Sequence, residues 1–167
     1  MFDAFFLRKF RRIHPRHIGY RSPLSGYAAV ADESRHEHEH LDDAQLRTAV
    51  HGTFTDLMGG RAVTRAIGGL GRRAPRATAR TLARAIPHLF RWLVGPVERT
   101  GPTTLHIPTC RFLTETSPQI CLRVCRKPTE DFFTDTLHVA TRLTPDHRTS
   151  SCLITLGPST EGREQLP

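Results

Sequence analysis

The sequence predicts an α+β protein in which a helical N-terminal half packs on a small β-α-β-β antiparallel module that carries every cysteine. Three observations predict this class. Apolar residues recur at helical spacing through much of the first 97 residues. After Gly95 and Pro96 the chain becomes rich in β-branched residues, and all four cysteines lie in the last third. The 167 residues are enough for one domain with its own core.

Residues 1–26 predict a basic amphipathic start followed by a loop. Apolar residues between 2 and 13 are three to four positions apart, with Arg and Lys between them, which is typical of a helix. The next stretch, up to Gly26, is rich in Pro, Gly and Ser and predicts a loop. The start has no secretory pattern and no apolar run approaches the roughly 20 residues of a membrane span. We therefore expect a protein of the cytoplasm or the plastid stroma, peripheral to a membrane and not secreted.

Residues 27–97 predict a helical, Arg-rich region. Helices are expected over 27–40 and 41–58, where Gly59 and Gly60 interrupt the pattern. From Leu57 to Val97 there are eight arginines and no acidic residue. Pro75 suits the first turn of a further helix, kinked near Pro87. On that helix the arginines collect on the face opposite the apolar stripe.

Residues 98–157 predict the cysteine module, and residues 158–167 a disordered tail. A strand should end near Cys110, and Ser117 with Pro118 should begin a helix. Pro128 is expected to restart that helix. Two strands over 138–145 and 151–157 should then pair through a polar turn.

The four cysteines are the strongest chemical signal in the sequence. Cys121 and Cys125 are four residues apart on the predicted helix, so their sulfurs share one face. Cys110 and Cys152 could complete a set of four thiolates that suits iron, an iron–sulfur cluster or zinc. Buried thiols in a small core and disulfides are the alternatives.

Several fragments resemble the β-carotene isomerases of the plant Dwarf-twenty-seven type. They are WLVGPVERTG, HIPTCRFLTET, CLRVCRKPTEDFF and the SSC that ends at Cys152, all in family order, and they are strongest over residues 92–157. The resemblance implies an isomerase that interconverts all-trans and cis β-carotene and contains iron. It places Cys110, Cys121, Cys125 and Cys152 at family cysteines.

Isomerising a polyene needs a transient loss of double-bond order, through a radical or a cation, and a redox-active iron centre would supply this. We expect an apolar carotenoid to bind beside the thiols. The candidate lining residues are Phe112, Leu122, Phe132 and Phe133, for which a place in the core is the alternative.

The sequence also departs from the family pattern. A further cysteine expected between Cys110 and Cys121 is absent, and Glu130 replaces a glutamine. This favours a second hypothesis, a non-enzymatic metal or redox module, or a lipid-docked binding module, that kept the fold.

The basic helix has its own interpretations. Together with the Phe-rich start it predicts docking on an anionic membrane surface. The residues for this are Phe5, Phe6, Arg76, Arg80 and Arg84. Nucleic-acid binding is a weaker alternative, because no nucleic-acid-binding motif accompanies the arginines. The third interpretation is that the arginines form an ordinary helix face exposed to solvent.

The stretch RHEHEH contains the zinc-protease spacing in His36, Glu37 and His40. Its polar flanks offer no apolar stripe to bury a zinc site. We therefore expect this stretch to be solvated surface.

Overall fold

The computed structural model describes residues 2–157, so the predicted tail at 158–167 lies outside the described residues. The N-terminal helices are α1 (Phe2–Ile18), α2 (Gly26–His40), α3 (Asp43–Leu57), α4 (Arg61–Arg73), α5 (Pro75–Leu89) and α6 (Arg91–Val94). The C-terminal elements are β1 (Glu98–Arg99), β2 (Thr104–Ile107), α7 (Arg111–Glu115), α8 (Pro118–Ile120), η1 (Cys121–Arg126), α9 (Lys127–Asp131), η2 (Phe132–Thr136), β3 (Ala140–Asp146) and β4 (Ser151–Gly157). Within this part of the chain, no helix combines the length and apolarity that crossing a bilayer requires.

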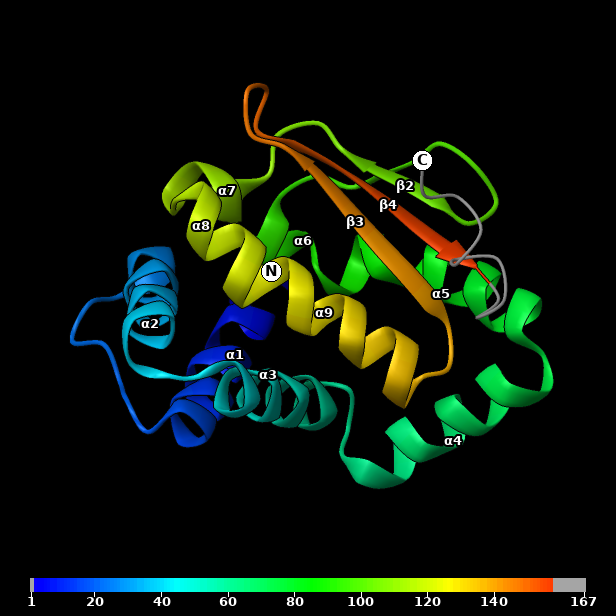
Figure 1. Ribbon diagram of the computed structural model, residues 1–167, viewed down its shortest axis with the longest axis horizontal. Helices are drawn as coiled ribbons and strands as arrows, with labels where there is room; N and C mark the ends of the chain where they lie inside the picture. Colours follow the sequence, from blue (N-terminus) through cyan, green and yellow to red (C-terminus); the bar gives the residue numbers. More distant parts are fainter. Residues whose placement is uncertain (1, 158–167) are drawn as a thin grey trace.

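The four strands form one antiparallel sheet in the order β1-β2-β4-β3, which confirms the α+β class and adds the short β1 (Figure 1). Along β4 the side chains alternate between the core and solvent, as expected for a sheet with one covered face. Cys152, Ile154 and Leu156 are buried, whereas Leu153 is exposed. The alternation therefore turns Cys152 toward the interior.

The segments α8, η1, α9 and η2 form one continuous helix, the yellow helix in Figure 1, so the expected restart at Pro128 is wrong. A proline ring inside a helix clashes with the carbonyl four residues earlier. The helix widens just before Pro128, where the Lys127 amide donates to the Leu122 carbonyl, five residues back. This π-type turn makes room for the ring, and it carries Cys121 and Cys125.

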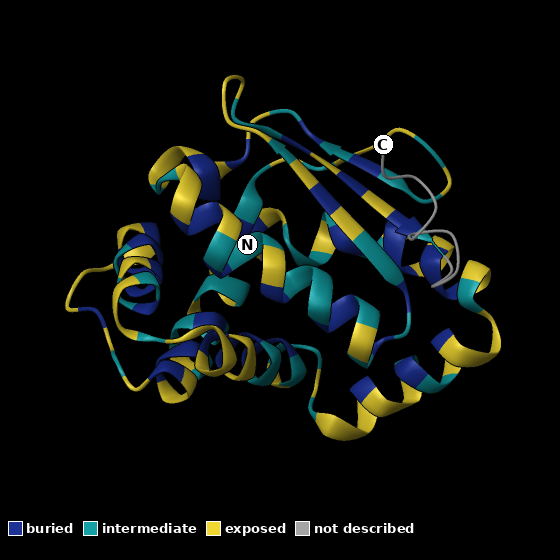
Figure 2. Cartoon of the chain, viewed as in Figure 1, coloured by how far each residue is buried: buried dark blue, intermediate teal, exposed yellow. Residues whose placement is uncertain are grey.

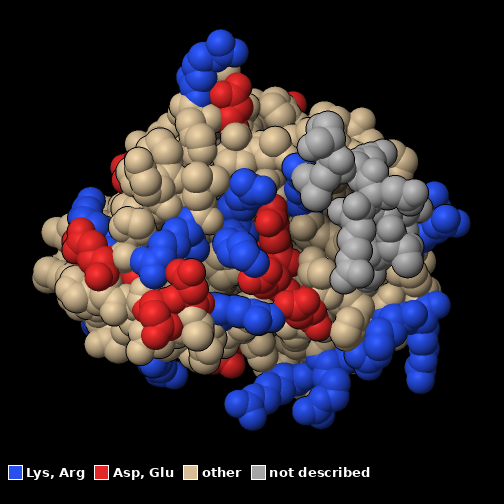
Figure 3. Space-filling view, viewed as in Figure 1, with Lys and Arg blue, Asp and Glu red and all other residues tan. Residues whose placement is uncertain are grey.

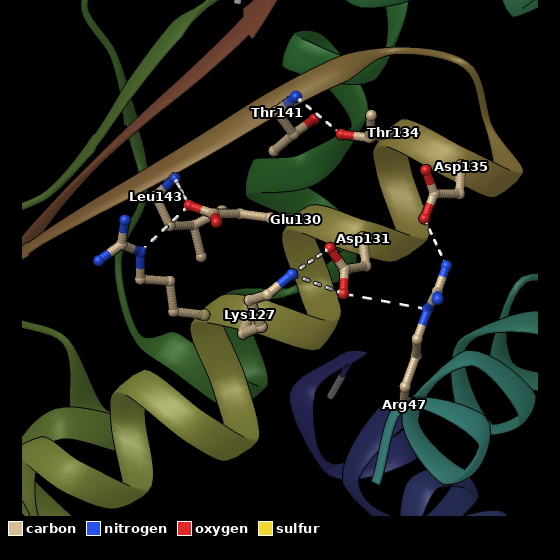
Figure 4. Close-up of polar contacts among 9 residues, drawn as sticks. Arg47, Lys127, Glu130, Asp131, Thr134, Asp135, Thr141 and Leu143 are labelled. Atoms are coloured by element: carbon tan, nitrogen blue, oxygen red, sulfur yellow. Dashed lines mark hydrogen bonds and ion pairs between the residues drawn. The ribbon is translucent and has the colours of Figure 1, made fainter. Parts of the chain in front are cut away.

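Polar contacts hold this long helix between β3 and α3 (Figure 4). Glu130 Oε1 accepts a hydrogen bond of 2.7 Å from the Leu143 amide on β3 and one of 3.2 Å from Arg126 Nε. Asp135 pairs with Arg47 of α3 at 2.5 Å. Glu130, a departure from the family pattern, thus links the cysteine-bearing helix to the sheet.

Helix α1 continues past its expected end, through Pro15 to Ile18. Phe10, His14 and Ile18 are four residues apart and all buried, so tertiary packing extends the helical face that the prolines and glycines obscured. The Pro15 carbonyl accepts from the Gly19 amide at 3.1 Å. The predicted loop is therefore limited to residues 19–25.

Helix α4 lies inside the region that was predicted to be helical, but the sequence analysis did not name it as a separate helix. It begins directly after Gly59 and Gly60, which have φ values of +103° and +94°. Two later glycines let it approach η2 closely: a Cβ on Gly68 would lie 2.5 Å from the Thr136 carbonyl oxygen, and one on Gly71 1.9 Å from that of Leu137. The rest of α4 is largely exposed (Figure 2).

Candidate functional site

The four cysteines come from three separate elements and line one cavity of about 60 Å³. Cys110 precedes the first turn of α7, Cys121 and Cys125 lie on η1, and Cys152 lies on β4. Apart from Arg126 and two threonines, the remaining lining is apolar, and it includes Phe90, Phe133 and Leu143. The local reason is geometric, because four-residue spacing on a helix and inward alternation on β4 both direct sulfur to the same interior.

All four thiols are free, so the disulfide alternative is wrong for this structure. Burial raises the pKa of each of these thiols. Repulsion from the neighbouring thiol groups raises the pKa of Cys121, Cys125 and Cys152 still more. The pKa of Cys121 rises to about 11 and that of Cys152 to about 12. The pKa of Cys110 is also raised, and that of half-buried Cys125 lies well above its ordinary value. At neutral pH the cavity is therefore ringed by neutral S–H groups.

An iron centre is not assembled in this arrangement. Among residues 2–157, no group of three or more His, Cys, Asp or Glu side chains is placed to hold one metal ion. The thiols share a cavity without converging on a single point. Binding a metal through all of them requires their deprotonation and an inward movement.

The structure places the expected pocket residues in different surroundings. Phe133 lines the thiol cavity. Phe112 lines a second cavity beside it. Phe132 is fully buried, with its ring centroid 5.3 Å from that of Phe54 and 5.8 Å from that of Phe133. Leu122 is 39% exposed and lines neither cavity.

The expected docking residues lie at the surface. Phe5 is 56% exposed and packs edge-on against half-buried Phe6. Arg76, Arg80 and Arg84 are exposed along α5, as the helical pattern predicted. Figure 3 shows Lys and Arg side chains, without acidic ones, at the edge where Figure 1 places α4. Arg80 and Arg84 also border a surface depression of about 420 Å³ with Arg99 of β1.

The interpretation of RHEHEH as solvated surface is wrong for one residue. Glu37 is 1% exposed, whereas His36 and His40 stack on each other near the surface with ring centroids 4.3 Å apart. The second cavity, of about 50 Å³, contains Glu37 together with buried His14. Sequence reasoning missed this pair. The signal for it was the spacing of Val30, Glu33 and Glu37 on one face of α2.

Comparison with known proteins agrees with the motifs. Residues 92–165 match the family model described as Beta-carotene isomerase D27-like, C-terminal. No curated protein and no solved structure matches the chain. The matched segment contains all four cysteines and the sheet that positions them. This segment of the chain is therefore similar to the C-terminal domain of the β-carotene isomerase D27-like family.

Proposed function

We propose that the protein is a cis/trans isomerase of a carotenoid-type polyene and that the thiol cavity is its reaction site. One observation carries the proposal: four thiols from three elements surround one apolar cavity inside the segment that matches the isomerase family. An apolar lining suits a hydrocarbon chain, because neither the lining nor the chain gives up hydrogen bonds when water is excluded.

The cavity must open to admit such a ligand. Its volume of about 60 Å³ is well below the roughly 300–1,000 Å³ of ordinary ligand sites. Phe90 and Phe133 are flat rings on its wall, with centroids 6.5 Å apart and without the close stacking that would lock them. Rotation of these side chains is the smallest change that enlarges the cavity.

The thiols would contribute to the reaction as ligands of a redox-active metal. Turning a polyene double bond needs a temporary loss of its bond order, which an apolar wall alone does not provide. We also propose the four cysteines as ligands of an iron ion or cluster, loaded after the inward movement described above. A redox-active iron would supply that loss of bond order when bound.

The direct test is chromatography of the isomers after incubation of iron-replete protein with all-trans β-carotene. We expect a shift of the isomer ratio that is lost in Cys121→Ser and Cys125→Ser. Leu122→Ala is the matched control, because Leu122 lies between these cysteines on η1 but points away from the cavity. An unchanged ratio with the intact chain would remove the isomerase proposal.

A second function, a metal or redox module without isomerase activity, is favoured by the absent family cysteine between Cys110 and Cys121. Metal analysis after anaerobic purification separates the two. Iron near one equivalent that is lost in both serine variants, together with an unchanged isomer ratio, supports the second function. Protein that is metal-free and fully stable contradicts iron binding in either function.

We further propose that the protein docks on an anionic membrane through a basic surface, defined here as the exposed faces of α4 and α5. Charge complementarity supports this, because the segment from Leu57 to Val97 has eight arginines and no acid. On α4, Val63 and Leu70 are 42% and 57% exposed and lie two turns apart on one face. Apolar side chains among arginines are typical of a helix that lies in the lipid interface.

Vesicle co-sedimentation tests the docking. We expect binding to vesicles that contain phosphatidylglycerol, weak binding to pure phosphatidylcholine, and loss at high salt. Leu70→Ser should weaken binding about fivefold, the effect of partly burying one leucine side chain. Leu153→Ser, which alters an equally apolar exposed residue on the sheet, should not. Binding to RNA or DNA in place of anionic vesicles would instead support the nucleic-acid alternative.

A further inference from the structure

Three arginines from two elements surround a depression in the surface of the protein. Arg80 and Arg84 lie one turn apart on the exposed face of α5, and Arg99 borders the same depression from β1, against which α5 packs. The rest of the lining is the β1–β2 turn, from Thr100 to Pro102. Among the described residues, no aspartate or glutamate contributes to this lining. The depression is therefore a concave and strongly positive part of the surface.

These three guanidinium groups have no carboxylate partner within residues 2–157. Several other arginines at the surface form ion pairs with acidic residues: Arg47 with Asp135, Arg91 with Asp3, and Arg123 with Asp43. Like charges four residues apart on a helix repel, so Arg80 and Arg84 weaken α5 unless an anion lies between them. Binding of an anion in the depression would remove this repulsion.

The arrangement suits a phosphate group that carries a further polar group. A guanidinium group presents parallel N–H donors that match two phosphate oxygens, whereas an ammonium group acts as a point charge. The volume of about 420 Å³ falls within the roughly 300–1,000 Å³ of ordinary ligand sites and is more than a bare phosphate ion fills. The β1–β2 wall is held in place, because the Thr100 and Gly101 amides both donate to the Thr104 carbonyl, at 3.0 and 3.2 Å.

We propose that Arg80, Arg84 and Arg99 form a binding site for the phosphate headgroup of an anionic phospholipid. The inference rests on the proposed docking and names the group on the membrane that the protein recognises. Charge complementarity supports a lipid as the occupant, because two of the three arginines belong to the basic surface. Ile86, on the buried face of the same helix, lines the thiol cavity. A lipid held in the depression thus places the membrane against a helix that forms a wall of the proposed reaction site.

Titration calorimetry of the full chain with short-chain lipids tests the site without a membrane. The probe is dihexanoyl phosphatidylglycerol below the concentration at which it forms micelles, and the comparisons are dihexanoyl phosphatidylcholine and inorganic phosphate. We expect one saturable site for phosphatidylglycerol. Phosphatidylcholine should bind at least about fivefold more weakly, because the arginines repel its choline cation. Inorganic phosphate should also bind more weakly than phosphatidylglycerol, because it fills less of the depression.

Three variants separate a defined site from general attraction to a basic protein. Arg99→Gln should weaken phosphatidylglycerol binding about tenfold, the effect of losing one charge-assisted hydrogen bond. Arg99→Lys keeps the charge but loses the paired donors, and it should weaken binding about threefold. Arg148→Gln is the matched control, because Arg148 is exposed on the β3–β4 turn, outside the basic surface, and its replacement lowers the net charge equally. The affinity of this control should be almost unchanged.

The outcomes separate this site from the proposed docking. Vesicle binding without saturable binding of the short-chain lipid overturns the site and leaves the docking intact. Equal effects of Arg99→Gln and Arg148→Gln show general charge attraction only, and they also overturn the site. Tighter binding of inorganic phosphate than of phosphatidylglycerol identifies a free anion as the occupant and overturns the lipid assignment. Absence of both vesicle binding and short-chain lipid binding overturns the docking and the site together.

Discussion

Replacing Glu37 with methionine should make the protein more stable. Methionine has nearly the length and volume of glutamate, so the replacement leaves no large void in the second cavity. It removes a carboxyl group that is 99% buried and that accepts no hydrogen bond from the residues that the structure describes. The desolvation cost of such a group is about 1–3 kcal/mol. His14 Nε2 loses the oxygen 3.3 Å away, which offsets part of the gain. The net expectation is a gain of about 1–2 kcal/mol in the free energy of unfolding.

Glu33→Met is the matched control on the same helix. It breaks the 2.5 Å pair with Arg11, whose side chain is only 18% exposed. Leaving a mostly buried guanidinium without its carboxylate should cost about 3 kcal/mol. Both free energies come from urea unfolding at neutral pH, where the midpoint should rise for Glu37→Met and fall for Glu33→Met. A loss of several kcal/mol in Glu37→Met would contradict this expectation and would show that His14 and Glu37 form a strong ion pair.

Two further predictions concern packing and the thiols. Gly71→Ala should destabilise the protein by about 1–3 kcal/mol, because its Cβ would overlap the Leu137 carbonyl. Gly69→Ala is the control: a Cβ at Gly69 meets nothing within 4 Å, so this variant should stabilise the protein by about 0.5–1 kcal/mol. Thermal melts of both variants measure these effects, and equal effects would contradict the close approach of α4. Above pH 9 the Cys121 thiol loses its proton in the unfolded state but keeps it in the folded state, where its pKa is about 11. The contribution of Cys121 to the free energy of unfolding is therefore complete below pH 9 and should fall by about 3 kcal/mol as the pH rises to about 11. Urea midpoints across this range measure it, and Cys121→Ser should flatten the decline; an identical decline would show that other groups cause it.

The parts of the fold that the sequence predicted are those in which local pattern and tertiary packing agree. Alternating β-branched residues identified β3 and β4, and Ser117 caps the helix that follows by accepting from the Ile120 amide at 3.3 Å. The clustering of four cysteines predicted that they would share one site. The widened helical turn that carries Cys121 and Cys125 before Pro128 is not shown by any residue pattern.

The missed features are those in which tertiary contacts override local preference. Gly68 and Gly71 lower the helical propensity of α4, yet both are required where it meets η2. Glu37 lies in a sequence of charged residues and histidines that predicts solvent exposure. It is buried because α1 runs five residues beyond its expected end and places His14 against α2.

The isomer ratio of bound polyene decides whether the four thiols around the apolar cavity form a polyene isomerase site. The intact chain is loaded with iron and incubated with all-trans β-carotene, and the extracted pigment is separated by chromatography. We expect a cis isomer to accumulate with the intact chain and with Leu122→Ala, and none to form with Cys121→Ser or Cys125→Ser. Polyene that stays bound to the iron-loaded chain and yet returns entirely in the all-trans form would contradict the isomerase proposal.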